Sequence, residues 1–484
     1  MLQPVRIVLL ICLVLSGLAF AQTASVTGRV TDPSGAVIPG VAVILTNEVF
    51  SIENRTETNE EGYYRLASIQ PGAYRLTIEK SGFKPIRESG LQLIVGQVAR
   101  LDYTLQVGAV TESVEVSARA VLLDSETSSL GQVIGGKQIT ELPLLGRNAY
   151  SLATLAPGVR TSAGMNDLPV DQISTVSASI NGSRASQNEF LLDGAPNTAA
   201  AQNQPVIFQN VDSVQEFKVE TNTFSAEYGR SAGGVFNVVT KAGTNDITFT
   251  AYEFLRNDKL NGSDWFANRA GRRKAPFRFN QFGGVIGAPI VKNRTFFFGA
   301  AELVRFTQGV TWTGTVPRPE QLAGDFSTTR NAAGQVITIY DPLTTTQTAT
   351  GGYIRQPFSG NLIPTSRFDN VARNMAKYFP APTTAGATNT GVNNYTRTGG
   401  NNVTKDTFST RVDHNLNDRN RLFGRFSYDK SPIVRAAAYG PDNIASPTHG
   451  TQVFNRYNTV VEDTHVFTPS LLSTVRSSFA RLSN

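Results

Sequence analysis

Apolar and polar residues alternate along the second half of the chain in stretches that are long enough to be membrane-spanning strands. Within one stretch, Phe408 and Val412 alternate with Arg411 and Asp413. A period of two residues is typical of strands that have one apolar and one polar face. The pattern predicts strands with apolar side chains toward lipid and charged side chains toward a lumen. The predicted strands are residues 247–256, 278–287, 295–306, 406–416, 421–430, 451–466 and 471–480.

The connections between these strands alternate between long and short. Short connections are predicted at residues 288–294, 417–420 and 467–470, and long ones at 257–277, 307–405 and 431–450. Outer-membrane barrels combine short periplasmic turns with long extracellular loops, so the alternation predicts such a barrel. Long external loops suit ligand capture. The first long connection carries a basic cluster, which either contacts lipopolysaccharide or ligand or is a solvated face. Its members are Arg269, Arg272, Arg273 and Lys274.

The number of predicted strands is too small for a closed transporter barrel. A plugged barrel of about 22 strands, each of about 10 residues, uses about 220 residues before any loop is counted. Positions 246–484 provide only 239 residues for strands and loops together. Seven is also an odd number, whereas bacterial single-chain barrels have even numbers of strands. We therefore expect a C-terminally truncated chain, either a fragment or a shortened product. An open sheet edge in lipid is unfavourable, so we do not expect this chain alone to form a stable pore.

The amino terminus predicts export. A short basic segment precedes an apolar run at residues 7–20, and Ala19-Phe20-Ala21 fits a cleavage site. This pattern is typical of a secretory signal peptide at residues 1–21. The one cysteine, Cys12, lies inside it, so disulfides and thiolate chemistry are not expected in the mature chain. The net charge of +6 is interpreted as surface chemistry, without nucleic acid, because an exported chain seldom meets it.

Residues 26–107 have the turn spacing of a small β-sandwich, with Pro39-Gly40, Glu61-Gly62 and Pro71-Gly72 between short strands. Two phrases, GRVTDPSGAVIPGVAVIL at 28–45 and GYYRLASIQPGAYRLTIEKSGF at 62–83, resemble the carboxypeptidase regulatory-like domain. That resemblance implies a prealbumin-like fold, also grouped with carbohydrate-binding-like sandwiches, without peptidase activity.

Three segments further along the chain resemble, in the same order, the plug domain of TonB-dependent receptors of the Oar-like group. They are LPLLGRNAYSLATLAPGV at 142–159, NGSRASQNEFLLDG at 181–194 and EFKVETNTFSAEYGRSAGGVFNVVTKAGTN at 216–245. In the last, Phe217 and Val219 alternate with Lys218 and Glu220, which predicts half-buried strands. The resemblance implies an α+β plug whose motif residues are Asn181, Gly182, Arg184, Asp193, Gly194, Glu227, Tyr228, Gly229, Arg230, Gly233 and Gly234.

Residues 110–118, VTESVEVSA, precede the plug and alternate apolar with polar positions. An exposed strand of this kind can pair with a partner by strand addition. The segment resembles the TonB box, which implies TonB and its inner-membrane energising complex as partners. A plain linker strand is the alternative. The TonB-box-like residues are Glu112, Ser113, Val114, Glu115 and Val116.

Together these patterns predict a mainly β protein. The expected parts are the signal peptide (1–21), the sandwich (22–108), the TonB-box-like segment (109–118), the plug (119–245) and the N-terminal part of an antiparallel transmembrane barrel (246–484). The expected location is the Gram-negative outer membrane, with the plug and the sandwich on the periplasmic side.

No pattern indicates an enzyme. The three histidines, His414, His449 and His465, lack a metal-ligand spacing, and no GxSxG or GxxxxGK[ST] motif is present. We therefore expect no catalytic, metal or cofactor site. The leading hypothesis is a receptor that imports a siderophore, oligosaccharide or peptide when TonB rearranges the plug. The alternative is a surface protein that binds glycans or matrix through its sandwich without active transport.

Overall fold

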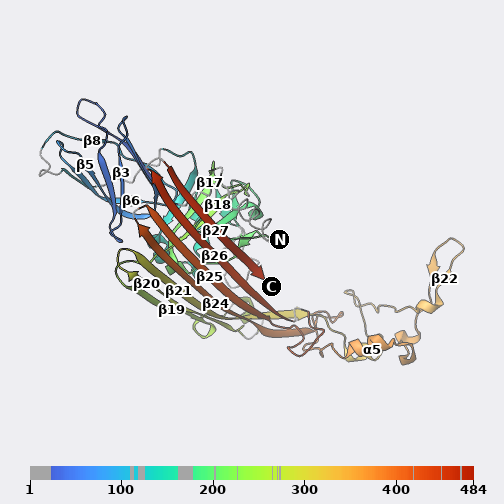
Figure 1. Cartoon of the computed structure of the whole chain (residues 1–484). Coiled ribbons are helices and arrows are strands. Elements are labelled where there is room, and N and C mark those ends of the chain that lie inside the picture. The colour runs from blue at the N-terminus through green and yellow to red at the C-terminus, as the bar shows by residue number, and fades with distance from the viewer. Residues whose placement is uncertain are drawn as a thin grey trace, which may run out of the picture.

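The computed structural model describes residues 23–108, 114–117, 126–161, 178–200, 203–225, 227–229, 231–263, 265–269, 271, 274–417, 419–447, 450–468 and 471–483. Its described residues are mainly β, with a two-sheet unit at the N-terminus, a smaller central sheet and a large antiparallel sheet (Figure 1). The expected signal peptide, including Cys12, lies outside the described residues. Among the helices described, none is both long and apolar enough to cross a membrane.

The N-terminal unit is a β-sandwich. One sheet contains β1 (Ala24–Thr31), β4 (Tyr63–Ile69), β7 (Val98–Arg100) and β8 (Tyr103–Thr104). The other contains, in spatial order, β3 (Glu53–Glu57), β2 (Ala42–Asn47), β5 (Gly72–Glu79), β6 (Ile86–Leu93) and β9 (Val114–Ser117). Every second side chain of β1 is buried, among them Val26 and Val30, which meet Leu45 and Leu76 of the other sheet in one core. Alternation thus places one face of each sheet in the shared core.

The central unit is an α+β plug. Its five-stranded sheet has the order β10 (Leu130–Gly135), β17 (Val214–Asn222), β18 (Val235–Thr240), β13 (Glu189–Leu192) and β14 (Ala195–Pro196). Two short pairs lie beside it, β11 (Val159–Thr161) with β12 (Ala178–Ile180) and β15 (Thr198–Ala199) with β16 (Gln204–Pro205). The helical pieces are α2 (Gly136–Glu141), η1 (Leu145–Arg147), η2 (Ala149–Leu155), η3 (Ala185–Gln187) and η4 (Val211–Ser213).

An aromatic cluster forms the core of the plug. The rings of Phe190 and Phe236 stack with centroids 5.0 Å apart, and Tyr150 meets Phe217 edge to face at 5.5 Å. Tyr150 is held there because the side chain of Asn148 accepts a hydrogen bond from its backbone N–H at the start of η2. Buried aromatic pairs of this geometry stabilise a core beyond their buried area.

The prediction that β17 is half-buried was wrong. Phe217 and Val219 lie in the core, and the alternate residues Lys218 and Glu220 are also buried, with only 9% and 5% of their surfaces exposed. These two side chains form an ion pair of 2.7 Å, and the sandwich loop at Gly96 packs beside Lys218. Both faces of the strand are therefore covered, which its own alternation does not reveal.

The large sheet consists of seven strands in sequence order, each antiparallel to the next. Each overlaps one of the seven predicted strands, so that prediction is confirmed. The strands are β19 (Thr248–Asn257), β20 (Phe277–Val291), β21 (Thr295–Gly314), β24 (Tyr395–Asn417), β25 (Asn420–Arg435), β26 (Gly450–Thr468) and β27 (Leu471–Ser483).

The long connection predicted at residues 307–405 is shorter and more ordered than expected. Strands β21 and β24 continue into it and stay paired up to Gly314 and Tyr395, with the Thr311 and Thr398 hydroxyls 2.9 Å apart. β-Branched threonines favour such an extension. The remainder contains α4 (Pro319–Leu322), η6 (Pro342–Thr344), β22 (Thr346–Gln347), β23 (Tyr353–Ile354), η7 (Ser359–Asn361), η8 (Thr365–Arg367) and α5 (Asn370–Ala376).

The first long connection also contains local structure, η5 (Asp258–Leu260) and α3 (Trp265–Arg269). Of its predicted basic cluster, the Arg269 guanidinium lies over the Trp265 ring at 5.2 Å, and Lys274 donates to the carbonyl of Asn261. Arg272 and Arg273 lie outside the described residues.

The two faces of the large sheet differ as the alternation predicts. Phe408 and Phe426 are 45% and 46% exposed on the outer face, whereas Arg411 and Arg425 are 6% and 2% exposed. The plug packs on this charged face of the sheet, so the charged side chains there contact protein. Figure 1 shows the sandwich at one end of the sheet and the segment with β22 and α5 at the other.

We predict that Gly28→Ala destabilises the sandwich. A Cβ at Gly28 would lie 1.8 Å from the carbonyl oxygen of Leu101, which also accepts the hydrogen bond of the Tyr64 hydroxyl. Overpacking of this kind costs about 1 to 3 kcal/mol in the free energy of unfolding, measured by urea titration. Gly135→Ala is the matched control, because a Cβ at Gly135 meets no atom within 4 Å. Equal stabilities for the two variants would contradict the prediction.

Candidate functional site at the contact between plug and barrel

Asp193 occupies a tight turn between β13 and β14. Asp193 and Gly194 both have positive φ, 48° and 71°, and Leu192 pairs with Ala195 across the turn. Two consecutive positive φ values are typical of a type I′ hairpin turn, for which Asp-Gly is a favoured sequence. The turn projects the Asp193 carboxylate out of the plug sheet and toward the barrel.

Four groups bind the Asp193 carboxylate. Within the plug, the backbone N–H and the hydroxyl of Thr240 donate to it at 2.8 and 2.9 Å. From the barrel, Arg425 Nε donates at 2.7 Å and a terminal nitrogen of Arg411 at 3.2 Å. The Asp193 side chain is only 3% exposed. Charge-assisted hydrogen bonds in such a dry setting are strong, and each partner depends on the others.

The two arginines face the plug because of strand register. Arg411 of β24 and Arg425 of β25 are direct cross-strand partners, so their side chains leave the same face of the sheet. Like charges in this position repel. Arg411 also binds both oxygens of Asp413, at 2.8 and 2.9 Å, and Arg425 donates to the Asn458 side chain at 2.7 Å. For the two guanidinium groups of Arg411 and Arg425, Asp413 is one carboxylate partner and Asp193 is the second.

Further polar contacts extend this interface along the sheet. Arg476 of β27 donates to the Gly194 carbonyl at 2.9 Å and pairs with Glu462 at 2.5 Å. Gln209 of the plug donates to Ser427 at 3.0 Å, and Asn458 donates to the Pro196 carbonyl at 3.0 Å. Buried polar networks of this kind fix one relative position of two bodies, because displacement leaves several groups unsatisfied.

A second charged cluster lies on the same face of the sheet. Asp429 of β25 pairs with Arg456 and with Lys405, whose Nζ lies 3.6 Å away. The hydroxyls of Thr407 and Ser431 also donate to Asp429. Lys405 lies 5.5 Å from the centroid of the Phe208 ring of the plug. This cluster is complete within the barrel, in contrast to the arginine pair that depends on Asp193.

The predicted plug motif residues divide between the two ends of β13 and β18. Asp193 and Gly194 lie at the barrel contact. Asn181, with positive φ, lies near the other end and donates to the Thr221 carbonyl at 2.7 Å. Gly233 and Gly234 lie there too, where added Cβ atoms would approach Asn188 Oδ1 to 2.6 Å and Ile180 Cδ1 to 2.4 Å. The two glycines thus permit close packing of loop on loop.

The remaining motif residues lie around this second end of the plug. The backbone N–H of Arg184 donates to Oε1 of Gln187 in η3 at 3.2 Å, and Gly182 has a φ of 82° in the adjacent turn. Glu227, Tyr228 and Gly229 follow β17, and the Tyr228 ring lies 6.5 Å from Phe224. Arg230 lies outside the described residues.

The TonB-box-like segment forms an edge strand of the sandwich. Val114, Glu115 and Val116 belong to β9, which pairs in parallel with β6 from Ile86↔Val114 to Ser89↔Ser117. β9 is the last strand in its sheet, so one side is paired and the other is an edge. Glu112 and Ser113 lie outside the described residues.

The sandwich contacts both the plug and the barrel. The backbone N–H of Val95 donates to Glu216 of the plug at 2.9 Å, and Gln70 donates to Asp413 of the barrel at 3.2 Å. Burial raises the pKa of Glu216 from its ordinary value of 4.5 to about 7, although Val95 and Lys218 act in the opposite direction. The contact between sandwich and plug therefore contains a titratable group.

The histidines occupy separate places. His414 Nδ1 lies 2.8 Å from the Thr295 hydroxyl, and the His465 ring lies 4.4 Å from the Phe467 ring. His449 lies outside the described residues. In the described part of the chain, no group of three or more His, Cys, Asp or Glu side chains is placed to hold a metal ion.

Sequence reasoning identified Asp193 as a plug motif residue and Arg411 as a lumen-facing residue of a strand, but it missed that Asp193 meets both Arg411 and Arg425. It also missed Thr240 and Asn458, which complete the network. The available signal was the position of Arg411 and Arg425 on the lumen side of neighbouring strands, where two cations require an acidic partner from elsewhere.

An antiparallel sheet with an apolar outer face, and a plug held on its charged face, define an outer-membrane barrel protein with a plug domain. The outer membrane beta barrel domain family matches residues 239–484, and the chain belongs to that family. The carboxypeptidase regulatory-like domain matches residues 25–106. The location is the outer membrane.

The chain is also similar to proteins that have names. The chain is 28% identical over 293 residues to the TonB-dependent transporter Oar of Myxococcus xanthus, a match that covers 58% of this chain and 26% of that protein. The matched part is thus about a quarter of the relative's length. Among solved structures, the outer membrane transporter YddB from Escherichia coli aligns with TM-score 0.41 and 14% identity, over 72% of this chain and 38% of that one. The ferric enterobactin receptor PfeA of Pseudomonas aeruginosa aligns with TM-score 0.40 and 14% identity, over 73% and 41%.

We predict that Asp193→Asn weakens the attachment of the plug. The amide keeps the shape of the side chain but removes the charge between the two arginines. Breaking a buried ion pair on one side costs about 3 to 5 kcal/mol, measured as the free energy of unfolding in urea. Asp246→Asn removes an exposed carboxylate and should change stability by less than about 0.5 kcal/mol. A loss no larger than that of the control would show that the network does not hold the plug.

We predict that Glu216 makes a pH-dependent contribution to the free energy of unfolding. Because its folded pKa lies above its unfolded value, the folded state binds the extra proton between pH 4.5 and about 7. Stability should therefore fall as pH rises through this window, by about 3 kcal/mol at most, and level off above it. The free energy of unfolding should be measured from pH 4.5 to 8. We expect the decrease with pH to be absent in Glu216→Gln and to remain in Glu141→Gln, which changes an exposed position of α2. Identical pH profiles for wild type and Glu216→Gln would refute the assignment.

Proposed function

We propose that this chain belongs to a TonB-dependent outer-membrane receptor that binds a ligand and imports it when TonB rearranges the plug. The observation that carries the proposal is the buried contact of Asp193 with Arg411 and Arg425. This contact holds a separate folded unit against the charged face of a membrane sheet. A plug that is held by polar groups, and only sparsely by apolar ones, can move without exposing a hydrophobic core.

TonB would engage the chain by strand addition. The edge of β9, with Val114 to Val116 of the TonB-box-like segment, offers unpaired backbone groups for a partner strand. Force applied there reaches the sandwich through the β6 ladder, and the sandwich contacts the plug at Glu216. The energy for transport would come from the inner-membrane complex that drives TonB, so neither a cofactor nor covalent chemistry is part of the proposal.

The proposed ligand is a siderophore, oligosaccharide or peptide that reaches the protein from outside. The long connections at the end of the sheet opposite the sandwich would meet it first, and they would also meet lipopolysaccharide. Enterobactin, which PfeA binds, is one compound with which ligand binding can be tested. We place the sandwich and the plug on the periplasmic side, because short turns join the strands at the sandwich end.

We predict that Val116→Pro abolishes binding of a purified periplasmic TonB domain. Proline removes the backbone N–H of Val116 and is poorly accommodated inside a strand, so it disrupts the β9 edge that an added strand would extend. Ser117→Ala is the control, because it keeps every backbone donor of the strand. Calorimetric titration of the full chain in detergent micelles with the TonB domain should give binding for wild type and control and none for Val116→Pro. Equal binding by all three would exclude β9 as the TonB site.

The same variants distinguish transport from adhesion. If the chain imports its ligand, Val116→Pro should stop uptake by cells while surface binding of the ligand stays unchanged. A surface protein that only binds glycans would show the same binding and the same cell association with and without the substitution.

A further inference from the structure

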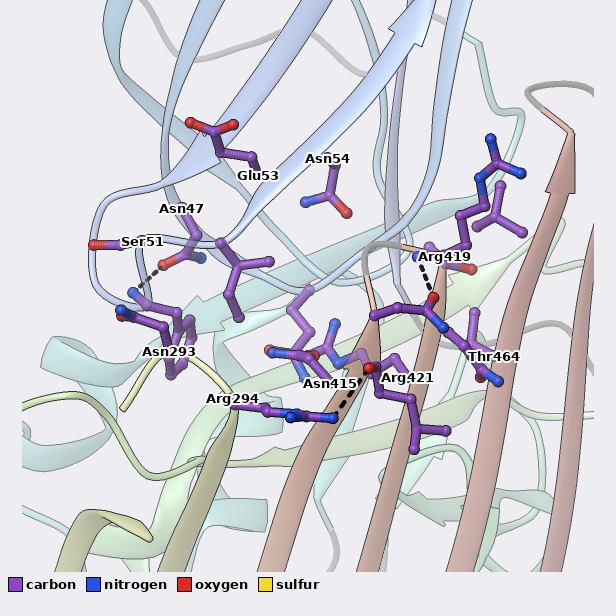
Figure 2. Close-up of a pocket in the computed structure, with 18 of the residues that line it drawn as sticks. Asn47, Ser51, Glu53, Asn54, Asn293, Arg294, Asn415, Arg419, Arg421 and Thr464 are labelled. Carbon is purple, nitrogen blue, oxygen red and sulfur yellow. Dashed lines mark hydrogen bonds between the residues drawn. The ribbon is translucent and has the colours of Figure 1, made fainter. Parts of the chain in front are cut away.

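A cavity of about 470 Å³ lies between the sandwich and the short turns of the barrel. Figure 2 shows Asn47, Ser51 and Glu53 on the sandwich side, and Arg294 and Arg421 on the barrel side. The barrel residues come from the turn that joins β20 to β21, from the turn that joins β24 to β25 with the adjoining ends of these two strands, and from β26. The cavity therefore exists only where the two units meet, at the end of the sheet opposite the long connections.

The charge that lines this cavity is strongly unbalanced. Four cationic side chains line it, Lys292, Arg294, Arg419 and Arg421. The lining contains one carboxylate, Glu53, which already pairs with Arg55 at 2.7 Å. Within the described ranges, none of the four cations has a carboxylate oxygen within 4 Å.

Arg421 shows the imbalance most clearly. Asp413 and Glu462 lie close enough to interact with it electrostatically. However, Asp413 is bound by Arg411, and Glu462 is bound by Arg476. Because Asp193 similarly accepts from Arg425, the three carboxylates of the plug contact match three guanidinium groups. Arg421 is a further cation beside this balanced set, and it lines the cavity.

The neutral part of the lining suits a polar ligand. Amide side chains are abundant, and each offers both a donor and an acceptor. The aromatic rings of Phe50 and Tyr74 add flat apolar surface. The amide residues are Asn47, Asn54, Gln70, Asn293, Asn415, Asn417 and Asn420.

We propose that this cavity is a binding site for a small polar anion that carries carboxylate or phosphate groups. Four cations facing one cavity repel each other, and an oxyanion between them removes the repulsion while forming charge-assisted hydrogen bonds. The ligand bridges the sandwich and the barrel turns, so its binding strengthens the contact between the two units. This site is different from the outer loops that would meet the imported ligand, and its test does not depend on TonB.

Calorimetric titration of the full chain in detergent micelles tests the site with three probes. Inorganic pyrophosphate represents phosphate ligands, citrate represents carboxylate ligands, and sucrose is an uncharged polar control. We expect pyrophosphate or citrate to bind with an affinity that falls at least about tenfold between low and high salt, and sucrose not to bind. The anion that binds more tightly identifies the oxyanion chemistry of the natural ligand.

Two variants connect binding to this cavity. Lys292→Gln with Arg419→Gln removes two cations whose side chains have no hydrogen-bond partner among the described residues, so folding should be preserved. We expect at least about a tenfold loss of anion affinity, because each lost cation weakens an electrostatic contact. Arg294→Gln provides an independent second variant. Arg65→Gln removes an exposed cation of β4 outside the cavity and should leave the affinity unchanged.

The proposal is wrong if neither anion binds the wild-type chain. It is also wrong if the anions bind but the double variant and Arg294→Gln bind them as tightly as Arg65→Gln does. Neither result would bear on the strand-addition test of β9, so failure of this site and failure of the proposed function can be told apart.

Discussion

The arrangement of plug and barrel depends on one buried carboxylate. Arg411 and Arg425 leave the same face of neighbouring strands, so the barrel sheet alone would hold two like charges side by side. Asp193 relieves this repulsion, and its own burial is possible only because Thr240 and the two arginines satisfy it. Each unit therefore contains charges that are complete only in the presence of the other.

The fold could be predicted from local patterns to a large extent. Each strand of the large sheet carries its own period of two, so the sequence indicates both its position and its lipid-facing side, as at Phe408 and Phe426. The Asp193-Gly194 pair likewise indicates a tight turn. These features depend on residues a few positions apart, and no distant partner is needed to recognise them.

The contacts between units could not be predicted in the same way. Lys218 and Glu220 look like the exposed face of a strand, but both are buried, and a sandwich loop more than a hundred positions earlier packs beside Lys218. Asp193 and Arg425 are separated by 232 positions. The parallel pairing of β9 with β6 depends on which edge of the sandwich is free. Each case requires the relative placement of two units, which alternation within one segment does not contain.

The β9 ladder and the Asp193 network would yield to force in different ways. The β9 ladder extends over four residue pairs at a sheet edge, where water can replace each broken hydrogen bond. The Asp193 network is nearly inaccessible to water, and a partial displacement leaves buried charges without partners. If TonB pulls on β9, the edge ladder should therefore open before the plug contact does, unless the added strand reinforces it. In the proposed mechanism, release of the plug would then need a force transmitted through the remaining chain or through the sandwich, and the Val95 contact with Glu216 would lie on the second of these routes.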